Sequence, residues 1–135
     1  MPPDTARRDA LARLLADLAA ATEGSAELDA AVLRAAGWVE RMNWRGAEWR
    51  NPTTGKMTER PGNPTRSLDA ITGLIEARGW EWFKDRPLYY DTGTALDGHA
   101  PLFFVGERGG KEWSQHKNDI LALCMGFIRA LEAAA

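Results

Sequence analysis

Residues that hold metals or form disulfides are scarce in this sequence. Cys124 is the only cysteine, so an intramolecular disulfide is excluded and a reducing compartment is favoured. The only histidines, His99 and His116, have no Cys, Asp or Glu at a recognised metal-ligand spacing. Cys124 falls on the apolar face of an expected helix, where a cysteine is usually a small buried hydrophobe. We therefore predict no metal and no cofactor, and we expect both histidines to lie in solvated loops.

Long apolar runs and a strong net charge are missing as well. No run approaches the roughly 18 apolar residues that a membrane span needs, and residues 1–4 lack a secretory signal pattern. The charges sum to 17 − 19 = −2 at pH 7, so no overall field attracts nucleic acid or an anionic membrane. The length of 135 residues matches one domain. These features predict a cytoplasmic protein without a membrane partner.

Known catalytic motifs fail on spacing or context. Residues 106–111 are glycine-rich and end in a lysine, but no Ser or Thr and no helix follows, so a hairpin turn is expected instead of a phosphate loop. Residues 91–97 lack the glutamate that ends a calcium-binding loop. A small hydrolase or nuclease, the less favoured alternative, would need one cluster in a single cleft: His99, Glu112, His116 and Asp119. We therefore expect a protein that is not an enzyme.

Apolar residues recur at the 3.6-residue period of a helix in four segments: 5–22, 26–36, about 67–77 and about 118–131. Either Thr65 or Ser67 is expected to cap the third helix, because short hydroxyl side chains accept from backbone N–H groups there. The first helix has a narrow leucine stripe and a charged opposite face. That stripe predicts packing at the edge of the domain, or self-pairing of this helix in a homo-oligomer.

Short aromatic and polar segments between the helices are typical of antiparallel strands. We expect strands at 38–44, 47–50, 56–59, 80–84, 88–90 and 102–105. Residues 51–55 are a predicted turn, since Pro, Asn and Gly tolerate turn dihedrals. The sequence therefore predicts an α+β protein, with a small, mainly antiparallel sheet and helices packed on it. We place an N-terminal helix at 1–24 and a single α+β domain at 25–135.

Tryptophans and cations alternate along the non-helical segments. Flat rings stack on nucleobases, and arginine forks bind phosphates and also stack on rings. The same residue types form the hot spots of protein interfaces. The predicted ligand-binding residues are Trp44, Arg45, Trp49, Arg66, Arg86, Tyr90 and Arg108. The competing interpretation places most tryptophans in the core, as for Trp38 and Trp80, which follow helix-ending glycines.

The order of several short motifs resembles a known family. They are a helix that ends in Gly-Trp, a Pro-Thr-Arg-Ser-Leu-Asp-Ala helix start, a second Gly-Trp and a final Leu-Ala-Leu-Cys…Arg-Ala-Leu helix. The residues concerned are Leu28, Asp29, Gly37, Trp38, Pro64, Thr65, Ser67, Leu68, Asp69, Ala70, Gly79, Trp80, Leu121, Ala122, Leu123, Cys124, Arg129 and Ala130. Over residues 26–133 the chain resembles the phage ABA-sandwich domain family, to which it adds an N-terminal helix. The resemblance implies a phage or prophage origin, a fold with α/β/α-type layers and no established catalytic residues.

The phage origin that the resemblance implies, together with an analogy of size and composition, directs the expected function. Some small phage proteins are anti-defence factors, and some of these sequester cyclic nucleotide-type immune signals. We expect a non-enzymatic phage accessory protein that binds a host-derived nucleotide signal in the host cytoplasm, with a homo-oligomer as one assembly. The alternative is a protein that inhibits a host defence complex by direct protein–protein contact.

Overall fold

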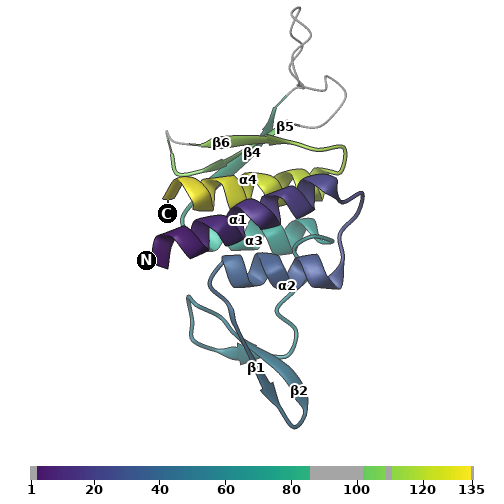
Figure 1. The fold of residues 1–135 in the computed structure, drawn as a ribbon, viewed down its shortest axis with the longest axis vertical. Coiled ribbons are helices and arrows are strands. Elements are labelled where there is room, and N and C mark those ends of the chain that lie inside the picture. Colours follow the sequence, from purple (N-terminus) through teal and green to yellow (C-terminus); the bar gives the residue numbers. More distant parts are fainter. Residues whose placement is uncertain (1–2, 86–101, 109–110, 135) are drawn as a thin grey trace, which may run out of the picture.

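The computed structural model describes residues 3–85, 102–108 and 111–134. Within them the chain forms helices and antiparallel strands, so the predicted α+β class is confirmed (Figure 1). The helices are α1 (Pro3–Ala20), α2 (Ala26–Ala35), α3 (Leu68–Ala77) and α4 (Asp119–Ala134). The strands are β1 (Val39–Asn43), β2 (Gly46–Arg50), β3 (Met57–Thr58), β4 (Glu81–Asp85), β5 (Leu102–Gly106) and β6 (Glu112–Gln115). The predicted strand at 88–90 and the loop at 91–97 lie outside the described residues.

The strands form two three-stranded sheets, ordered β1-β2-β3 and β4-β5-β6, where the sequence predicted one sheet. The helices lie between the β4–β6 sheet and the β1–β2 hairpin (Figure 1). Asn43 pairs with Gly46, and Trp44 and Arg45 therefore form the tip of a tight hairpin. Every side chain of β1 is exposed. The hairpin projects from the helices, and its exposed side chains include Val39, Met42 and Trp44 (Figure 1).

Two helices end in the same way, and each end places a tryptophan. Gly37 follows α2 with φ of 98°, and Gly79 follows α3 with φ of 75°. These left-handed glycines reverse the chain, so that the next N–H reaches back into the last turn. Trp38 N–H donates to Leu33 O at 3.0 Å, and Trp80 N–H donates to Ile75 O at 3.3 Å. At the start of α3, it is Ser67 that caps, with its Oγ accepting from Ala70 N–H, so Thr65 is left for another role.

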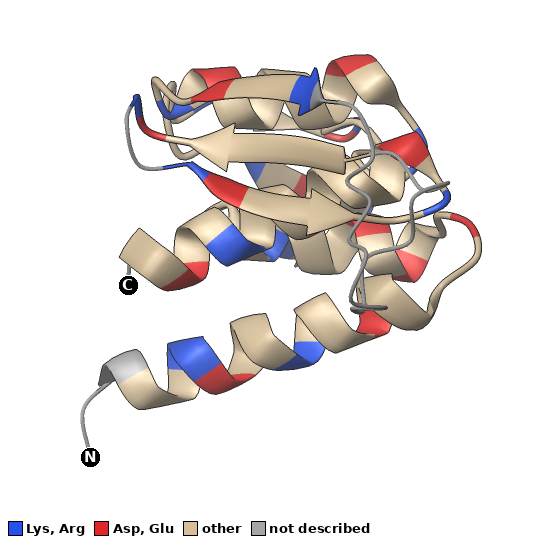
Figure 2. Ribbon diagram, turned by 90° about the horizontal axis from the view of Figure 1, so that it is seen from above, with Lys and Arg blue, Asp and Glu red and all other residues tan. Residues whose placement is uncertain are grey.

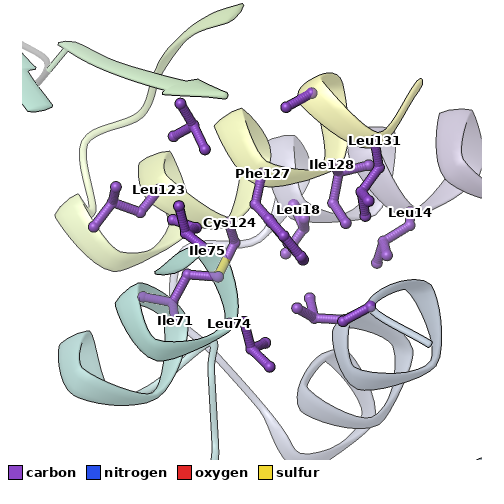
Figure 3. Packing of buried hydrophobic residues seen from close by; sticks show 14 of the residues in the cluster. Leu14, Leu18, Ile71, Leu74, Ile75, Leu123, Cys124, Phe127, Ile128 and Leu131 are labelled. Carbon is purple, nitrogen blue, oxygen red and sulfur yellow. The ribbon is translucent and has the colours of Figure 1, made fainter. Parts of the chain in front are cut away.

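Helix α4 is the centre of the core. Its buried residues, among them Ala122, Cys124, Phe127 and Leu131, cover most of its circumference and leave a partly exposed stripe that includes Arg129. The β4–β6 sheet covers one side, and α1, α2 and α3 pack on the others. Figure 3 shows Phe127 and Cys124 close to Ile75 of α3, with Ile128 and Leu131 toward α1. A helix with so much apolar surface is stable only when most of it is covered in this way.

Gly126 sets how closely α4 approaches the sheet. A Cβ at this position would lie 2.7 Å from Val105 Cγ2 and 2.9 Å from Ser114 Oγ, which is too close for ordinary contact. Ser114 is itself buried, and its hydroxyl donates to Ala122 O at 2.6 Å. The absence of a side chain at Gly126 therefore allows the helix to lie directly on β5 and β6.

Asp29 links α2 to the segment that precedes α3. Its carboxylate is buried and accepts from the N–H and the hydroxyl of Thr65. Arg66 completes the arrangement with Nε at 2.9 Å and Nη2 at 2.7 Å from Oδ2. The backbone also approaches closely here, because a Cβ on Gly24 would lie 2.0 Å from Thr65 O. Removal of a partner would leave the buried Asp29 carboxylate without that partner's hydrogen bonds, which is costly, so this network holds α2 and α3 in a defined relation.

The N-terminal helix shares the main core. Leu11, Leu14 and Leu18 are buried, and α1 packs along α4. The leucine stripe that suggested self-pairing is therefore already covered within the chain. The predicted homo-oligomer stays a prediction, and this stripe is not its interface.

The two helical glycines provide a matched test of the packing. Helix propensity alone predicts that Ala in place of Gly gains up to about 1 kcal/mol of stability at either site. We expect that gain for Gly73→Ala in α3, where a Cβ meets nothing within 4 Å. For Gly126→Ala we expect a loss of about 1–3 kcal/mol, because the new methyl group overpacks the sheet contact. Urea unfolding of both variants measures the two free energies, and equal gains would contradict the packing described for Gly126.

Candidate functional site

One candidate site is a cavity of about 660 Å³ beside α3, which we call the Trp38–Trp80 pocket. Its walls come from segments that are far apart in the sequence: the end of α2 with Trp38, the β2–β3 turn, one face of α3 with Arg78 and Trp80, and the end of α4. Its volume falls within the range of small-molecule sites, roughly 300–1,000 Å³. The tertiary fold thus brings the two tryptophans that follow helix-ending glycines to one pocket.

Arg78 is the cation of this pocket. Its guanidinium carbon lies 4.7 Å from the centre of the Trp80 ring, which is a cation–π distance. Trp80 is buried and also meets Phe127 edge-on, with ring centres 6.0 Å apart, so the ring is fixed. Burial, and next the charge of Arg7, lower the pKa of Arg78 from its ordinary value. No ion pair joins Arg78 to a carboxylate among the described residues.

Small residues leave the floor of the pocket open. Ala70, Gly73 and Ala77 of α3 face it, and Ala134 contributes from the end of α4. Gly73 has open space where a side chain would begin. A glycine in the middle of a helix costs stability, so its presence here keeps room beside α3 at the expense of helix propensity.

Polar groups line the rest of the pocket. Asp69 and Glu107 contribute exposed carboxylates, and the β2–β3 turn contributes Asn51 and Thr53. The turn is held by Asn51, whose Oδ1 accepts from Thr53 N–H at 2.8 Å. The pocket therefore combines flat rings, one cation and several hydrogen-bond acceptors, and its described lining contains no His, Cys or Ser.

The residues that the sequence singled out are scattered over the described structure. Trp44 is 87% exposed at the hairpin tip, with Arg45 4.6 Å above its ring. Trp49 is only 6% exposed and belongs to the core cluster, so the prediction that its ring stacks on a ligand does not fit its position. It faces the core because its register on β2 directs it toward α2, where Arg34 lies 5.7 Å from its ring.

The predicted arginines do not meet at a common site either. Arg66 is bound to Asp29, so its charge is used within the fold. Arg108 is exposed in the segment between β5 and β6. Arg86 and Tyr90 lie outside the described residues. The structure therefore brings none of the described predicted residues into the Trp38–Trp80 pocket.

Sequence reasoning assigned Trp38 and Trp80 to packing, and both do pack on the core. It missed that they also line a pocket with Arg78. The sequence signal that could have indicated this was the Gly-Trp pair that follows each of two helices. Two helix ends with the same geometry place their tryptophans in equivalent positions. Only the convergence of those ends in space makes them one site.

A second surface lies on the outer face of the β4–β6 sheet. Phe83, Phe104 and Trp113 are opposite one another across the three strands. The phenyl rings stack with centres 4.9 Å apart, and Phe83 and Trp113 are 44% and 41% exposed. Lys111 lies 5.8 Å from the Phe83 ring and Arg129 lies 4.8 Å from the Trp113 ring. Large exposed apolar patches generally mark contacts with another molecule. This cross-strand aromatic row is therefore a candidate contact surface.

Charge is otherwise mixed over the molecule. Figure 2 shows Lys and Arg interspersed with Asp and Glu along the helices and strands in that view. Lys111 pairs with Glu81 at 2.9 Å, and that hydrogen bond, followed by the lysine charge, lowers the pKa of Glu81. Among residues 3–85, 102–108 and 111–134, no helix combines the length and apolar character that crossing a membrane requires.

His116 is not the solvated loop residue that the sequence predicted. Its Nδ1 accepts from Asn118 N–H at 2.8 Å, so the other ring nitrogen carries the proton. That Nε2–H donates to Ala21 O at 2.8 Å, just past the end of α1. The half-buried ring therefore joins α1 to the start of α4. In the part of the chain that the structure describes, no three His, Cys, Asp or Glu side chains gather to hold a metal ion.

Comparison with protein-family models, curated proteins and solved structures found no match to this chain. The resemblance to the phage ABA-sandwich family therefore stays a prediction.

Cys124 provides a test of the core assignment. Its side chain is fully buried, and burial raises the pKa of the thiol well above its ordinary value. Since the thiolate is the reactive form, we expect almost no labelling by a thiol reagent in the native protein and rapid labelling in denaturant. Rapid labelling of the native protein in a time course would contradict the buried position.

Proposed function

We propose that this chain is a non-enzymatic binding protein that holds a nucleotide-type anion in the Trp38–Trp80 pocket. The observation that carries the proposal is Arg78, whose guanidinium carbon lies over the Trp80 ring, 4.7 Å from its centre, with no ion pair to a described carboxylate. A guanidinium held in this way has its donors available for an anion. Arginine combines stacking with bidentate binding of phosphate.

The other lining groups fit the remaining parts of a nucleotide. Trp38 offers a half-exposed aromatic surface on which a base can stack. Asp69 and Glu107 can accept hydrogen bonds from ribose hydroxyls or from the amino group of a base. The volume of about 660 Å³ leaves room for both base and sugar phosphate.

The biological role that we propose is sequestration. A host-derived nucleotide signal held in this pocket, in the host cytoplasm, would be withheld from its receptor. The lack of His, Cys and Ser among the described lining residues supports retention of the ligand over its conversion. A phage accessory role rests on the family resemblance, and the anti-defence role rests on an analogy of size and composition with small phage proteins; both are part of the proposal.

Two substitutions test the pocket directly. Arg78→Gln removes the cation, and Gly73→Leu fills the open floor while it raises helix propensity. Hydrogen bonds to charged groups contribute about 1.5–3 kcal/mol, so we expect Arg78→Gln to raise Kd roughly 10- to 100-fold. Thermal shift and calorimetry with cyclic dinucleotides, cyclic trinucleotides and ADP-ribose-type ligands provide the measurements.

Arg45→Gln is the matched control, because Arg45 also stacks on a tryptophan but lies at the hairpin tip. We expect this variant to bind like the wild type. The proposal fails if none of these ligands shifts the melting temperature of the wild type, or if Arg45→Gln weakens binding as much as Arg78→Gln does.

The cross-strand aromatic row favours a second candidate function, direct contact with a host protein. Truncation of a central interface aromatic typically costs 2 kcal/mol or more, roughly a 30-fold loss of affinity. We therefore expect Trp113→Ala to lose a stoichiometric host protein that the wild type retains in pull-downs. Trp44→Ala, which removes an even more exposed tryptophan, is the control. Equal retention by both variants would count against this surface.

A further inference from the structure

A second arginine lies close to the same pocket, on a different helix. Arg7 is in the first part of α1, and its Nη2 lies 3.4 Å from Ala35 O, at the end of α2. The next residue, Ala36, belongs to the wall of the Trp38–Trp80 pocket. Arg7 itself lines the neighbouring α1–α2 groove with Ala35, one residue before Ala36 in the wall of the pocket that contains Arg78.

The two arginines repel each other. Burial, and next the charge of Arg7, lower the pKa of Arg78. The described ion pairs of the chain use other cations, namely Arg34, Arg66, Lys84 and Lys111. Arg34 shows the contrast, because it lies near Arg7 beside the α1–α2 groove but is neutralised by Glu40 at 3.1 Å. Like charges held together without a counter-charge favour the binding of an anion between them.

The charges along α3 give the pocket a direction. Asp69 is in the first turn of the helix and Arg78 is its C-cap. With a rise of 1.5 Å per residue, their backbones are separated by about 14 Å along the axis. Arg78 therefore places a cation at one end of α3 and Asp69 places a carboxylate at the other, while Glu107 adds a second carboxylate beside Trp80. That polarity suits a ligand with phosphate at one end and hydroxyl or amino donors at the other.

We infer that Arg7 and Arg78 together clamp the phosphate group of the ligand, so that the N-terminal helix completes the pocket and selects phosphorylated ligands over nucleosides. This inference rests on the proposed function for the identity of the ligand. It adds a residue that lies outside the region of family resemblance. It also assigns each end of the pocket to one part of the ligand.

A purely structural role for Arg7 makes a different prediction. The carbonyl groups at a helix C-terminus attract cations, so Arg7 could serve only to cap α2. In that case its loss would lower stability slightly and would affect all ligands alike. A phosphate clamp affects phosphorylated ligands selectively.

The experiment compares ADP-ribose with adenosine by calorimetry, in the full chain and in the variants Arg7→Gln, Arg7→Lys and Arg13→Gln. We expect Arg7→Gln to weaken ADP-ribose binding about 10-fold or more and to leave adenosine binding unchanged. Arg7→Lys keeps the charge and is expected to restore part of the affinity. Arg13→Gln removes an exposed arginine from the same helix and is expected to change neither ligand.

The outcomes separate the two ideas. Equal weakening of both ligands by Arg7→Gln, or no weakening, overturns the clamp while the proposed function stands. If neither ligand binds the wild type, the nucleotide proposal fails for these probes, and pyrophosphate then tests the clamp alone. A melting-temperature rise with pyrophosphate that Arg7→Gln abolishes and Arg13→Gln retains supports the clamp. No rise in the wild type overturns it.

Discussion

The enclosure of α4 is the constraint on which the rest of the structure depends. Cys124, Phe127, Ile128 and Leu131 give this helix apolar surface toward several neighbours at once. Water must be excluded from all of that surface, so a sheet and three further helices are required around it. Gly126 allows the sheet to come close on one side. The relative positions of α1, α2 and α3 are therefore consequences of how each one covers part of α4.

The Asp29 network adds a polar constraint to this apolar one. Burial of a carboxylate is costly unless it is paired and hydrogen-bonded. Thr65 and Arg66 supply both conditions, and in doing so they hold the chain before α3 against α2. Because α2 and α3 are held together, their two C-terminal ends meet at the same place. Trp38 and Trp80 are brought to one pocket by this arrangement and not by their own contact.

The chemistry of the pocket follows from what the fold leaves unpaired. The charge of Arg66 is paired with Asp29 within the fold, whereas no described carboxylate forms an ion pair with Arg78 or Arg7. The proposals of nucleotide binding and of a phosphate clamp both rest on this difference. A count of arginines in the sequence cannot show it, since each residue has the same charge until its partners are known.

Local features determined much of the fold from the sequence. Ser25, Ser67 and the glycines after α2 and α3 set helix boundaries, because caps act over a few residues. The turn at 51–55 was likewise predictable from its Asn, Pro and Gly residues. The burial of Cys124 was predictable from the helical period of the apolar residues around it. Only the tertiary structure decided that the strands divide into two sheets, that Trp49 is core while Trp44 is exposed, and that His116 joins α1 to α4. The physical reason is that these outcomes depend on pairs of residues as many as 95 positions apart, as for His116 and Ala21, which meet only when α4 is enclosed.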